Sequence, residues 1–181
     1  MSNNTQMDNP SKGLSILNKK RILRSLDYEH KDIQTYSKNL LKVLEVFEYP
    51  SLRPNQVEPV MHLLNQNDLL LVSSTSSGKS FCYIAPALAM GLKTIVFFPL
   101  VALIQDQWKE LTQRGVRVGV VSSGVSLAES SRALAEWENG DLDFLFVAPE
   151  RLQNKKFLEL IVQIIKFHIF HYMILPHLQL L

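Results

Sequence analysis

The stretch LLLVSSTSSGKSFCYIAPAL, residues 69–88, decides the fold predicted for this chain. Its first four residues, 69–72, are apolar and have the length and flanks of a buried parallel strand. A serine-rich loop follows, and the run from Ser80 to Met90 predicts a helix that ends at Gly91. A strand, a loop and a helix in this order bring free backbone N–H groups and the positive end of a helix dipole to one point. The stretch therefore predicts a phosphate-binding site.

The end of this loop has residue types suited to a nucleotide. Gly78 lets the backbone approach a phosphate, Lys79 reaches the β- and γ-phosphates, and the Ser80 hydroxyl can ligate Mg²⁺. The strict pattern has glycine where Ser73 stands, but the looser pattern of a small residue, two further residues and Gly-Lys-Ser is met. The alternative is a serine-rich surface turn. The loop expected to bind the cofactor comprises Thr75, Ser76, Ser77, Gly78, Lys79 and Ser80.

The composition is that of an ordinary globular protein. The chain has 181 residues, 46% of them apolar and 20% charged, and its net charge is +2. This length allows one domain with a sizeable core, and the net charge indicates no strong global field toward nucleic acid or membrane. A single cysteine, Cys82, excludes a disulfide within the chain and a cysteine-rich zinc site. The polar N-terminus lacks a secretion signal, so an intracellular location is expected.

Strand and helix patterns alternate after the loop. Further strands are predicted at 94–98, 116–123 and 143–147, with helices at 100–111 and 126–140. The second of these helices opens with Ser126 and Glu129 in capping-box spacing. Alternation at this pitch predicts an α/β fold with a mainly parallel sheet and helices on both faces.

The chain is expected to divide into four parts. Residues 1–13 have the composition of a disordered tail. Residues 14–46 carry leucines three and four apart and predict a helical N-terminal extension. Residues 47–158 form the α/β lobe, and residues 159–181 form an apolar tail. A membrane span is not expected there, because lysine, glutamine, histidine and proline interrupt the apolar run.

Five ordered motifs, the loop among them, resemble those of the RecQ family of superfamily 2 DNA helicases. FEYPSLRPNQ (47–56) is similar to the adenine-recognition motif that precedes the phosphate loop. Three further stretches resemble the family motifs that follow the later strands: FFPLVALIQDQ (97–107), VVSSG (120–124) and VAPERL (147–152). The resemblance implies an incomplete RecA-like P-loop NTPase lobe, ATP and Mg²⁺ as cofactors, and DNA contacted through its backbone without a target sequence. It also implies DNA repair and recombination, in a eukaryotic nucleus or a bacterial cytoplasm.

The resemblance assigns roles to single positions. Tyr49 would stack on adenine, and Arg53 and Gln56 would contact the edge of the base, for which a ring and an amide are suitable. Packing at a helix end is the alternative for Tyr49. Backbone contacts with DNA are implied for Pro99, Gln105, Asp106, Gln107, Ser122 and Arg151. Helix capping and solvation are the alternatives for the polar members of that set.

Three positions of the adenine-recognition motif depart from the family. Glu48 stands in place of a glycine, Leu52 in place of an aromatic residue, and Asn55 in place of a second glycine.

A further departure concerns hydrolysis. In the family a fifth strand ends in Asp-Glu-Ala-His, where the aspartate holds Mg²⁺ through water and the glutamate positions the attacking water. Glu159 is the last acidic residue of this chain, so no catalytic residue is assigned. We therefore expect a truncated part of a 3′-to-5′ DNA helicase that neither hydrolyses ATP nor unwinds DNA alone. The alternatives are a non-catalytic isoform that binds nucleotide or DNA, and a fragment without function.

Overall fold

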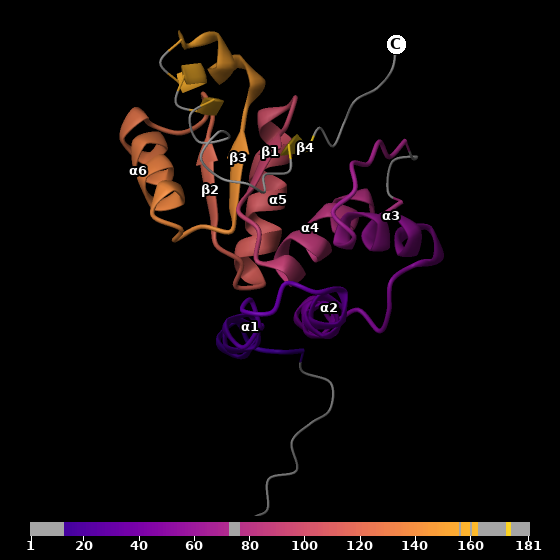
Figure 1. Ribbon diagram of the computed structural model, residues 1–181. Helices are drawn as coiled ribbons and strands as arrows, with labels where there is room; N and C mark the ends of the chain where they lie inside the picture. The colour runs from indigo at the N-terminus through magenta and orange to yellow at the C-terminus, as the bar shows by residue number, and fades with distance from the viewer. Residues whose placement is uncertain (1–12, 73–76, 156, 160, 163–172, 175–181) are drawn as a thin grey trace, which may run out of the picture.

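The computed structural model describes residues 13–72, 77–155, 157–159, 161–162 and 173–174. It is an α/β structure in which helices cover a parallel sheet (Figure 1). The helices are α1 (Ile16–Arg24), α2 (Ile33–Phe47), α3 (Pro54–Leu64), α4 (Lys79–Met90), α5 (Val101–Gln113), α6 (Leu127–Glu138) and the short 3-10 helix η1 (Pro149–Gln153). The strands are β1 (Thr94–Phe97), β2 (Val118–Val121), β3 (Phe144–Val147) and β4 (Met173–Ile174).

The sheet is parallel throughout the described strands. Its order is β2-β3-β1-β4, and each neighbouring pair is parallel. Thr94 of β1 and Val118 of β2 both stand opposite Phe144, the first residue of β3. Helix α5 connects β1 to β2 and α6 connects β2 to β3, as parallel strands of one sheet require. The carboxyl ends of the strands therefore lie along one edge of the sheet.

Both faces of the sheet are buried. Alternate strand residues enter a larger core cluster shared with α2, α4 and α5; they are Val96, Phe98, Phe144 and Phe146. The intervening residues enter a second cluster shared with α6; they are Ile95, Phe97, Leu145 and Val147. Successive strand side chains point to opposite faces, so apolar residues at every position cover both sides of a parallel sheet.

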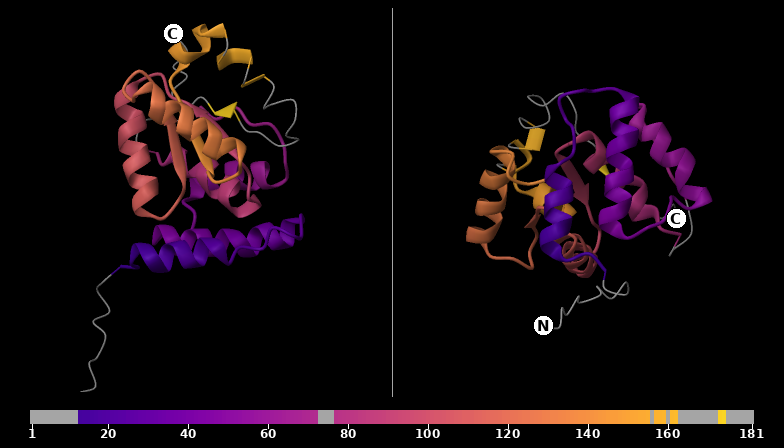
Figure 2. Two further views of the ribbon diagram at one scale, coloured as in Figure 1. Left: turned by 90° about the vertical axis from the view of Figure 1, so that its left-hand side faces the viewer. Right: turned by 90° about the horizontal axis from the view of Figure 1, so that it is seen from below.

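The N-terminal helices pack beneath this lobe. Figure 2 shows α1 and α2 lying together across its lower side. Asn39 of α2 is 1% exposed, and its amide nitrogen donates to the carbonyl oxygens of Asp27 and, at 2.9 Å, Ala89 of α4. Its amide oxygen accepts from the Asp27 N–H at 3.0 Å. One buried polar side chain thus joins the α1–α2 connection to α4 with its bonds satisfied.

The prediction of a strand at residues 69–72 is wrong. The backbone there is irregular, and Leu70 and Val72 are 78% and 72% exposed. A strand needs a neighbour for its backbone hydrogen bonds. Strand β1 already has β3 on one side and β4 on the other, and β4 at the sheet edge is two residues long. Among the described residues, the run is therefore left without a partner.

The other elements predicted for the lobe are confirmed, with ends shifted by a few residues. Ser126 and Glu129 form the predicted capping box, and Gly91 ends α4 in the left-handed conformation. The fold is consistent with part of a RecA-like lobe. Of the predicted tails, residues 1–12 and most of 159–181 lie outside the described residues. Within the part that the structure describes, no helix has the length and apolar character to cross a membrane.

The two-faced core predicts a large difference between two leucines. Leu145 is 0% exposed in β3, whereas Leu127 is 74% exposed at the start of α6. We expect Leu145→Ala to lower the free energy of unfolding by about 2–5 kcal/mol, because it removes buried methyl groups and leaves a cavity. The same change at Leu127 should cost less than about 0.5 kcal/mol. Urea unfolding followed by circular dichroism measures both, and equal costs would contradict a two-faced core.

Candidate nucleotide-binding site

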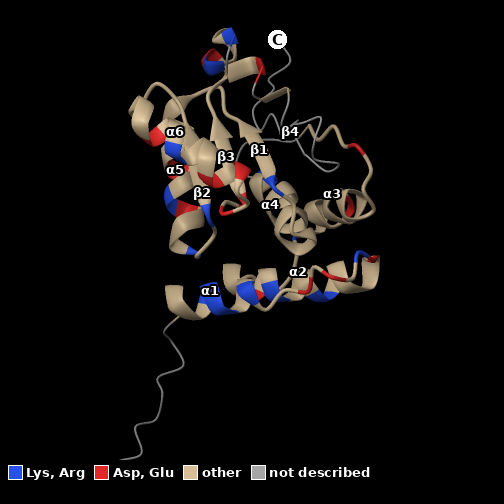
Figure 3. Cartoon of the chain, turned by 60° about the vertical axis from the view of Figure 1, so that its left-hand side comes forward, with Lys and Arg blue, Asp and Glu red and all other residues tan. Residues whose placement is uncertain are grey.

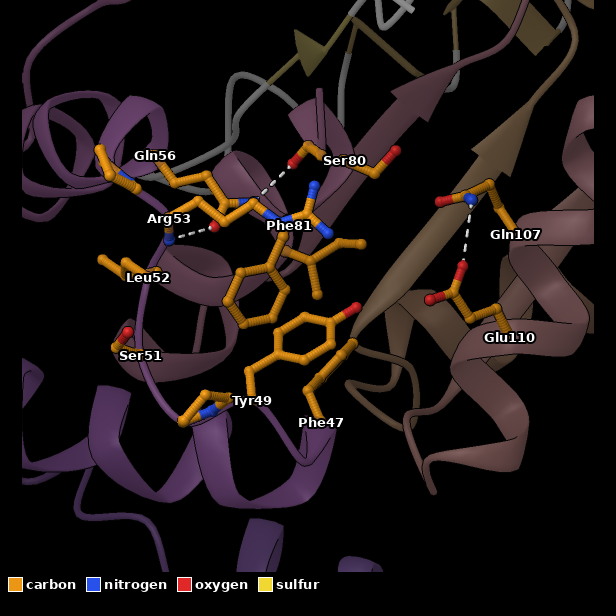
Figure 4. Close-up of a pocket in the computed structure, with 14 residues that line it drawn as sticks. Phe47, Tyr49, Ser51, Leu52, Arg53, Gln56, Ser80, Phe81, Gln107 and Glu110 are labelled. Atoms are coloured by element: carbon orange, nitrogen blue, oxygen red, sulfur yellow. Dashed lines mark hydrogen bonds between the residues drawn. The ribbon is translucent and has the colours of Figure 1, made fainter. Parts of the chain in front are cut away.

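A cavity of about 520 Å³ lies where the ends of several elements meet (Figure 4). Its lining includes Tyr49, Arg53 and Gln56 from the predicted adenine-recognition motif. It also includes Gly78 and Ser80 from the predicted phosphate loop. The structure therefore brings together two motifs that the sequence separates, in a volume typical of small-molecule sites.

Gln56 joins these two motifs directly. The side chain is 3% exposed. Its amide oxygen accepts from the Arg53 N–H at 2.9 Å, and its amide nitrogen donates to the Gly78 carbonyl oxygen at 3.0 Å. The first bond caps α3, whose first residue is Pro54. Because both ends of the amide are satisfied by backbone, the start of α3 is fixed against the start of α4.

Gly78 occupies a position that needs glycine. It precedes α4 with a φ of +82°, in the left-handed region. A Cβ atom there would lie 2.6 Å from the Gln56 amide nitrogen. Backbone conformation and space both exclude a side chain, so the backbone of Gly78 stays open to a close ligand.

The next two residues begin α4. Lys79 is its first residue, and Lys79 and Ser80 are both half-buried. The positive end of the helix dipole, an ammonium group and a hydroxyl thus gather at one helix end. Ser77 of the predicted loop lies just before them, and Thr75 and Ser76 lie outside the described residues.

Tyr49 lies at the edge of an aromatic cluster. Its ring centroid is 4.9 Å from that of Phe81, in an edge-on arrangement, and 6.0 Å from that of Phe47. The Arg114 guanidinium lies 5.8 Å from the Tyr49 ring and 4.8 Å from the Phe47 ring. Tyr49 is 37% exposed and lines the cavity. Part of its ring is therefore held in place by packing while part stays accessible, as stacking on a base requires.

Each departure from the family motif makes a contact of its own. Glu48 ends α2 with a φ of +59°, and its carboxylate accepts from the Leu14 N–H at 2.7 Å and pairs with Lys19 at 3.3 Å. Leu52 packs against the larger core cluster. The Asn55 amide donates to the Ser77 carbonyl oxygen at 3.0 Å. Asn55 thus adds a second tie, beside Gln56, between α3 and the loop.

The residues assigned to DNA occupy different environments. Pro99 follows β1 and is exposed, as are Gln105 and Asp106 on α5. Arg151 is half-buried in η1. Ser122 is 1% exposed, and its hydroxyl accepts from the Gly124 N–H at 3.2 Å. These five residues stay predicted DNA contacts, and Ser122 also stabilises a turn.

Gln107, the sixth residue assigned to DNA, lies elsewhere: it lines the cavity beside Gly78 and Ser80. Its amide nitrogen donates to Glu110 at 3.3 Å, and Glu110 in turn pairs with Arg114 at 3.4 Å. Two residues were not expected from the sequence: Glu110, which lines the cavity, and Arg114, which binds Glu110 from outside the lining. Their spacing from Gln107, three and seven positions, was the available signal, since such residues share a helix face.

Exposed cations gather on the N-terminal helices (Figure 3). They include Lys20, Arg21 and Arg24 of α1 and Lys38 of α2. A local basic surface of this kind attracts phosphate backbones even in a chain of low net charge.

A parallel sheet, a helix that begins at Gly78-Lys79-Ser80 and a cavity beside it place this chain in the class of RecA-like lobes. The chain matches the DEAD/DEAH box helicase family over residues 53–174, and so belongs to that family. It is 36% identical to the ATP-dependent DNA helicase RecQ of Haemophilus influenzae over 67% of the chain and 20% of the relative. It is 37% identical to the ATP-dependent DNA helicase Q-like 5 of Arabidopsis thaliana over 67% of the chain and 13% of the relative.

A fungal relative has a similar identity to this chain. The ATP-dependent helicase SGS1 of Saccharomyces cerevisiae is 34% identical over 62% of the chain and 8% of its own length. The matches therefore span between 8% and 20% of the length of these three relatives. The predicted resemblance to RecQ helicases is confirmed.

The geometry at Gly78 predicts an unequal cost for two glycine substitutions. Gly140 has nearly the same φ, +83°, but a Cβ atom there would meet nothing within 4 Å. We expect Gly140→Ala to cost about 1–2 kcal/mol of unfolding free energy from backbone strain alone. Gly78→Ala should cost about 2–4 kcal/mol, because it also displaces the buried Gln56 amide. Urea unfolding compares the free energies of unfolding of the two variants. Equal losses would mean that the Gln56 side chain moves aside without cost.

The contacts of Glu48 predict a pH effect on stability. The Leu14 N–H, and after it the Lys19 ammonium, hold the pKa of the Glu48 carboxyl below its ordinary value of 4.5. A carboxyl with a lowered folded-state pKa stabilises the fold above its unfolded-state pKa. That contribution is lost as the pH falls through the folded-state value. Between about pH 6 and pH 3, Glu48→Gln should therefore lose less stability than the unchanged chain.

Thermal unfolding across this pH range tests the expectation. Glu45→Gln is the matched control, since Glu45 is exposed on the same helix. If the stabilities of the Glu48 and Glu45 variants depend on pH in the same way, the contacts of Glu48 with Leu14 and Lys19 contribute nothing to the stability of the fold.

Proposed function

We propose that this chain binds ATP with Mg²⁺ as the ATP-binding portion of a RecQ-like DNA helicase. The observation that carries the proposal is the cavity in which Gln56 joins the adenine-recognition motif to the Gly78 backbone. Membership of the DEAD/DEAH box helicase family supports it.

The residues present fit this cofactor. Tyr49 offers a ring face to adenine, with Arg53 and Gln56 near its edge. The start of α4 and the Lys79 ammonium suit the phosphates. Among the described residues, no three His, Cys, Asp or Glu side chains gather as metal ligands. The Ser80 hydroxyl would therefore hold Mg²⁺ together with phosphate oxygens, the usual arrangement for this ion.

The activity of the whole protein is also a proposal. We infer ATP-driven 3′-to-5′ unwinding of DNA, serving repair and recombination in a eukaryotic nucleus or a bacterial cytoplasm. Two of the relatives are named as ATP-dependent DNA helicases. The exposed residues at the carboxyl ends of the strands and the cations of α1 and α2 would contact the DNA backbone. The role proposed for these 181 residues is the binding of ATP.

Nucleotide binding tests the proposal directly. We expect Lys79→Ala to weaken ATP–Mg²⁺ binding at least about tenfold, because it removes a charged contact with the phosphates. Lys109→Ala, at an exposed position of α5, is the matched control and should bind as the unchanged chain does. Titration calorimetry on the full chain measures both.

Three outcomes are distinguishable when phosphate release is assayed beside that titration. Saturable binding that depends on Lys79 without phosphate release supports the proposal, and it also fits a non-catalytic isoform. Phosphate release that depends on Lys79 would show that residues beyond the assigned set act as hydrolytic groups. Failure of the unchanged, folded chain to bind ATP would refute the proposal.

A further inference from the structure

Helix α5 presents polar side chains to the nucleotide cavity. Gln107 and Glu110 both line it, and Figure 4 shows them projecting toward it from the wall that faces Arg53 and Gln56. Their side chains are joined by the 3.3 Å hydrogen bond from the Gln107 amide to a Glu110 carboxylate oxygen. The other carboxylate oxygen accepts from Arg114, whose guanidinium packs over the Phe47 and Tyr49 rings. The wall is therefore tied to the aromatic cluster that carries the predicted base-stacking ring.

The wall has an unfilled capacity to accept hydrogen bonds. The Gln107 amide oxygen is shielded from bulk water and has no hydrogen-bond partner among the residues the structure describes. The Glu110 carboxylate only accepts, and each of its oxygens has one donor where two can be held. A buried acceptor without a donor is unfavourable, so this wall suits a ligand group that donates.

The charge of the wall decides which part of a nucleotide it suits. A carboxylate repels a triphosphate, and the phosphate-binding features of the site lie instead at Gly78, Lys79 and Ser80. The base is proposed to stack on the Tyr49 ring. The remaining part of the nucleotide is the sugar, whose two neighbouring hydroxyls are neutral donors. A pair of oxygen acceptors from adjacent turns of one helix matches such a diol.

We propose that Gln107 and Glu110 form a ribose-recognition wall, in which the Gln107 amide oxygen accepts a hydrogen bond from a ribose hydroxyl. The inference rests on the proposed binding of ATP and adds a determinant of sugar specificity to it. A site built to bond a hydroxyl discriminates against an analogue that lacks it, because its own polar group is then left unpaired. Arg114 acts as a positioning residue, since it holds Glu110 and lies against the ring of Tyr49.

The test compares four nucleotides on the full chain by titration calorimetry with Mg²⁺ present. They are ATP, 2′-deoxy-ATP, 3′-deoxy-ATP and inosine triphosphate, which lacks the exocyclic amine of adenine. We expect the analogue without the hydroxyl that faces Gln107 to bind about tenfold more weakly than ATP. Gln107→Leu should weaken ATP binding by the same factor and leave that analogue unchanged. Gln113→Leu, an exposed position on the same helix, should keep the preference for ATP.

The outcomes separate this inference from the function it rests on. If ATP and both deoxy analogues bind equally, the ribose wall is refuted while ATP binding stands. If only inosine triphosphate binds weakly, the site reads the edge of the base, as proposed for Arg53 and Gln56, and the sugar assignment of the wall is wrong. If no nucleotide binds, both the inference and the proposed function fail. The comparison within the unchanged chain decides the matter even where Gln107→Leu does not fold.

Discussion

The burial of both faces of the β1–β3 strand pair is the constraint on which the rest of this structure depends. A parallel sheet has no face that can be left to water when its strands are apolar at every position. Helices must cover both sides, and each crossover between neighbouring strands returns the chain to the same starting edge. The loops after β1, β2 and β3 therefore gather at the opposite edge. Pro99, Ser122 and Arg151, which are assigned to DNA, follow β1, β2 and β3 and so lie at that edge because the core requires this connectivity.

The proposed nucleotide cavity depends on a second, smaller constraint, the buried amide of Gln56. Its two hydrogen bonds fix the start of α3 to the start of α4. Gly78 makes this contact possible, because any side chain there would occupy the space of that amide. Asn55 reinforces this junction through its bond to the loop, whereas Glu48 ties the end of α2 to the N-terminal segment. Residues that differ from the family pattern thus hold their parts of the motif by contacts of their own.

Much of this fold could be predicted because its signals are local. Strand and helix periods, the capping box at Ser126 and the glycine that ends α4 each depend on a few neighbouring residues. The run at 69–72 shows the limit of such signals. Its composition is that of a strand, but a strand exists only where a neighbouring strand accepts its hydrogen bonds. That condition depends on segments far away in the chain, and among the described residues it is not met.

Helix α5 shows the same limit within the candidate site. The resemblance assigned Gln105, Asp106 and Gln107 together to a DNA surface, because they are adjacent in one motif. On a helix, adjacent residues point about 100° apart, since a turn takes 3.6 residues. Gln105 and Asp106 are exposed, while Gln107 and Glu110 line the cavity and Arg114 binds Glu110 from the next turn. One motif therefore contributes to two surfaces, and a single rigid helix lies between the nucleotide cavity and the edge assigned to DNA. A residue's place on the helix, more than its place in the motif, determines which ligand it can reach.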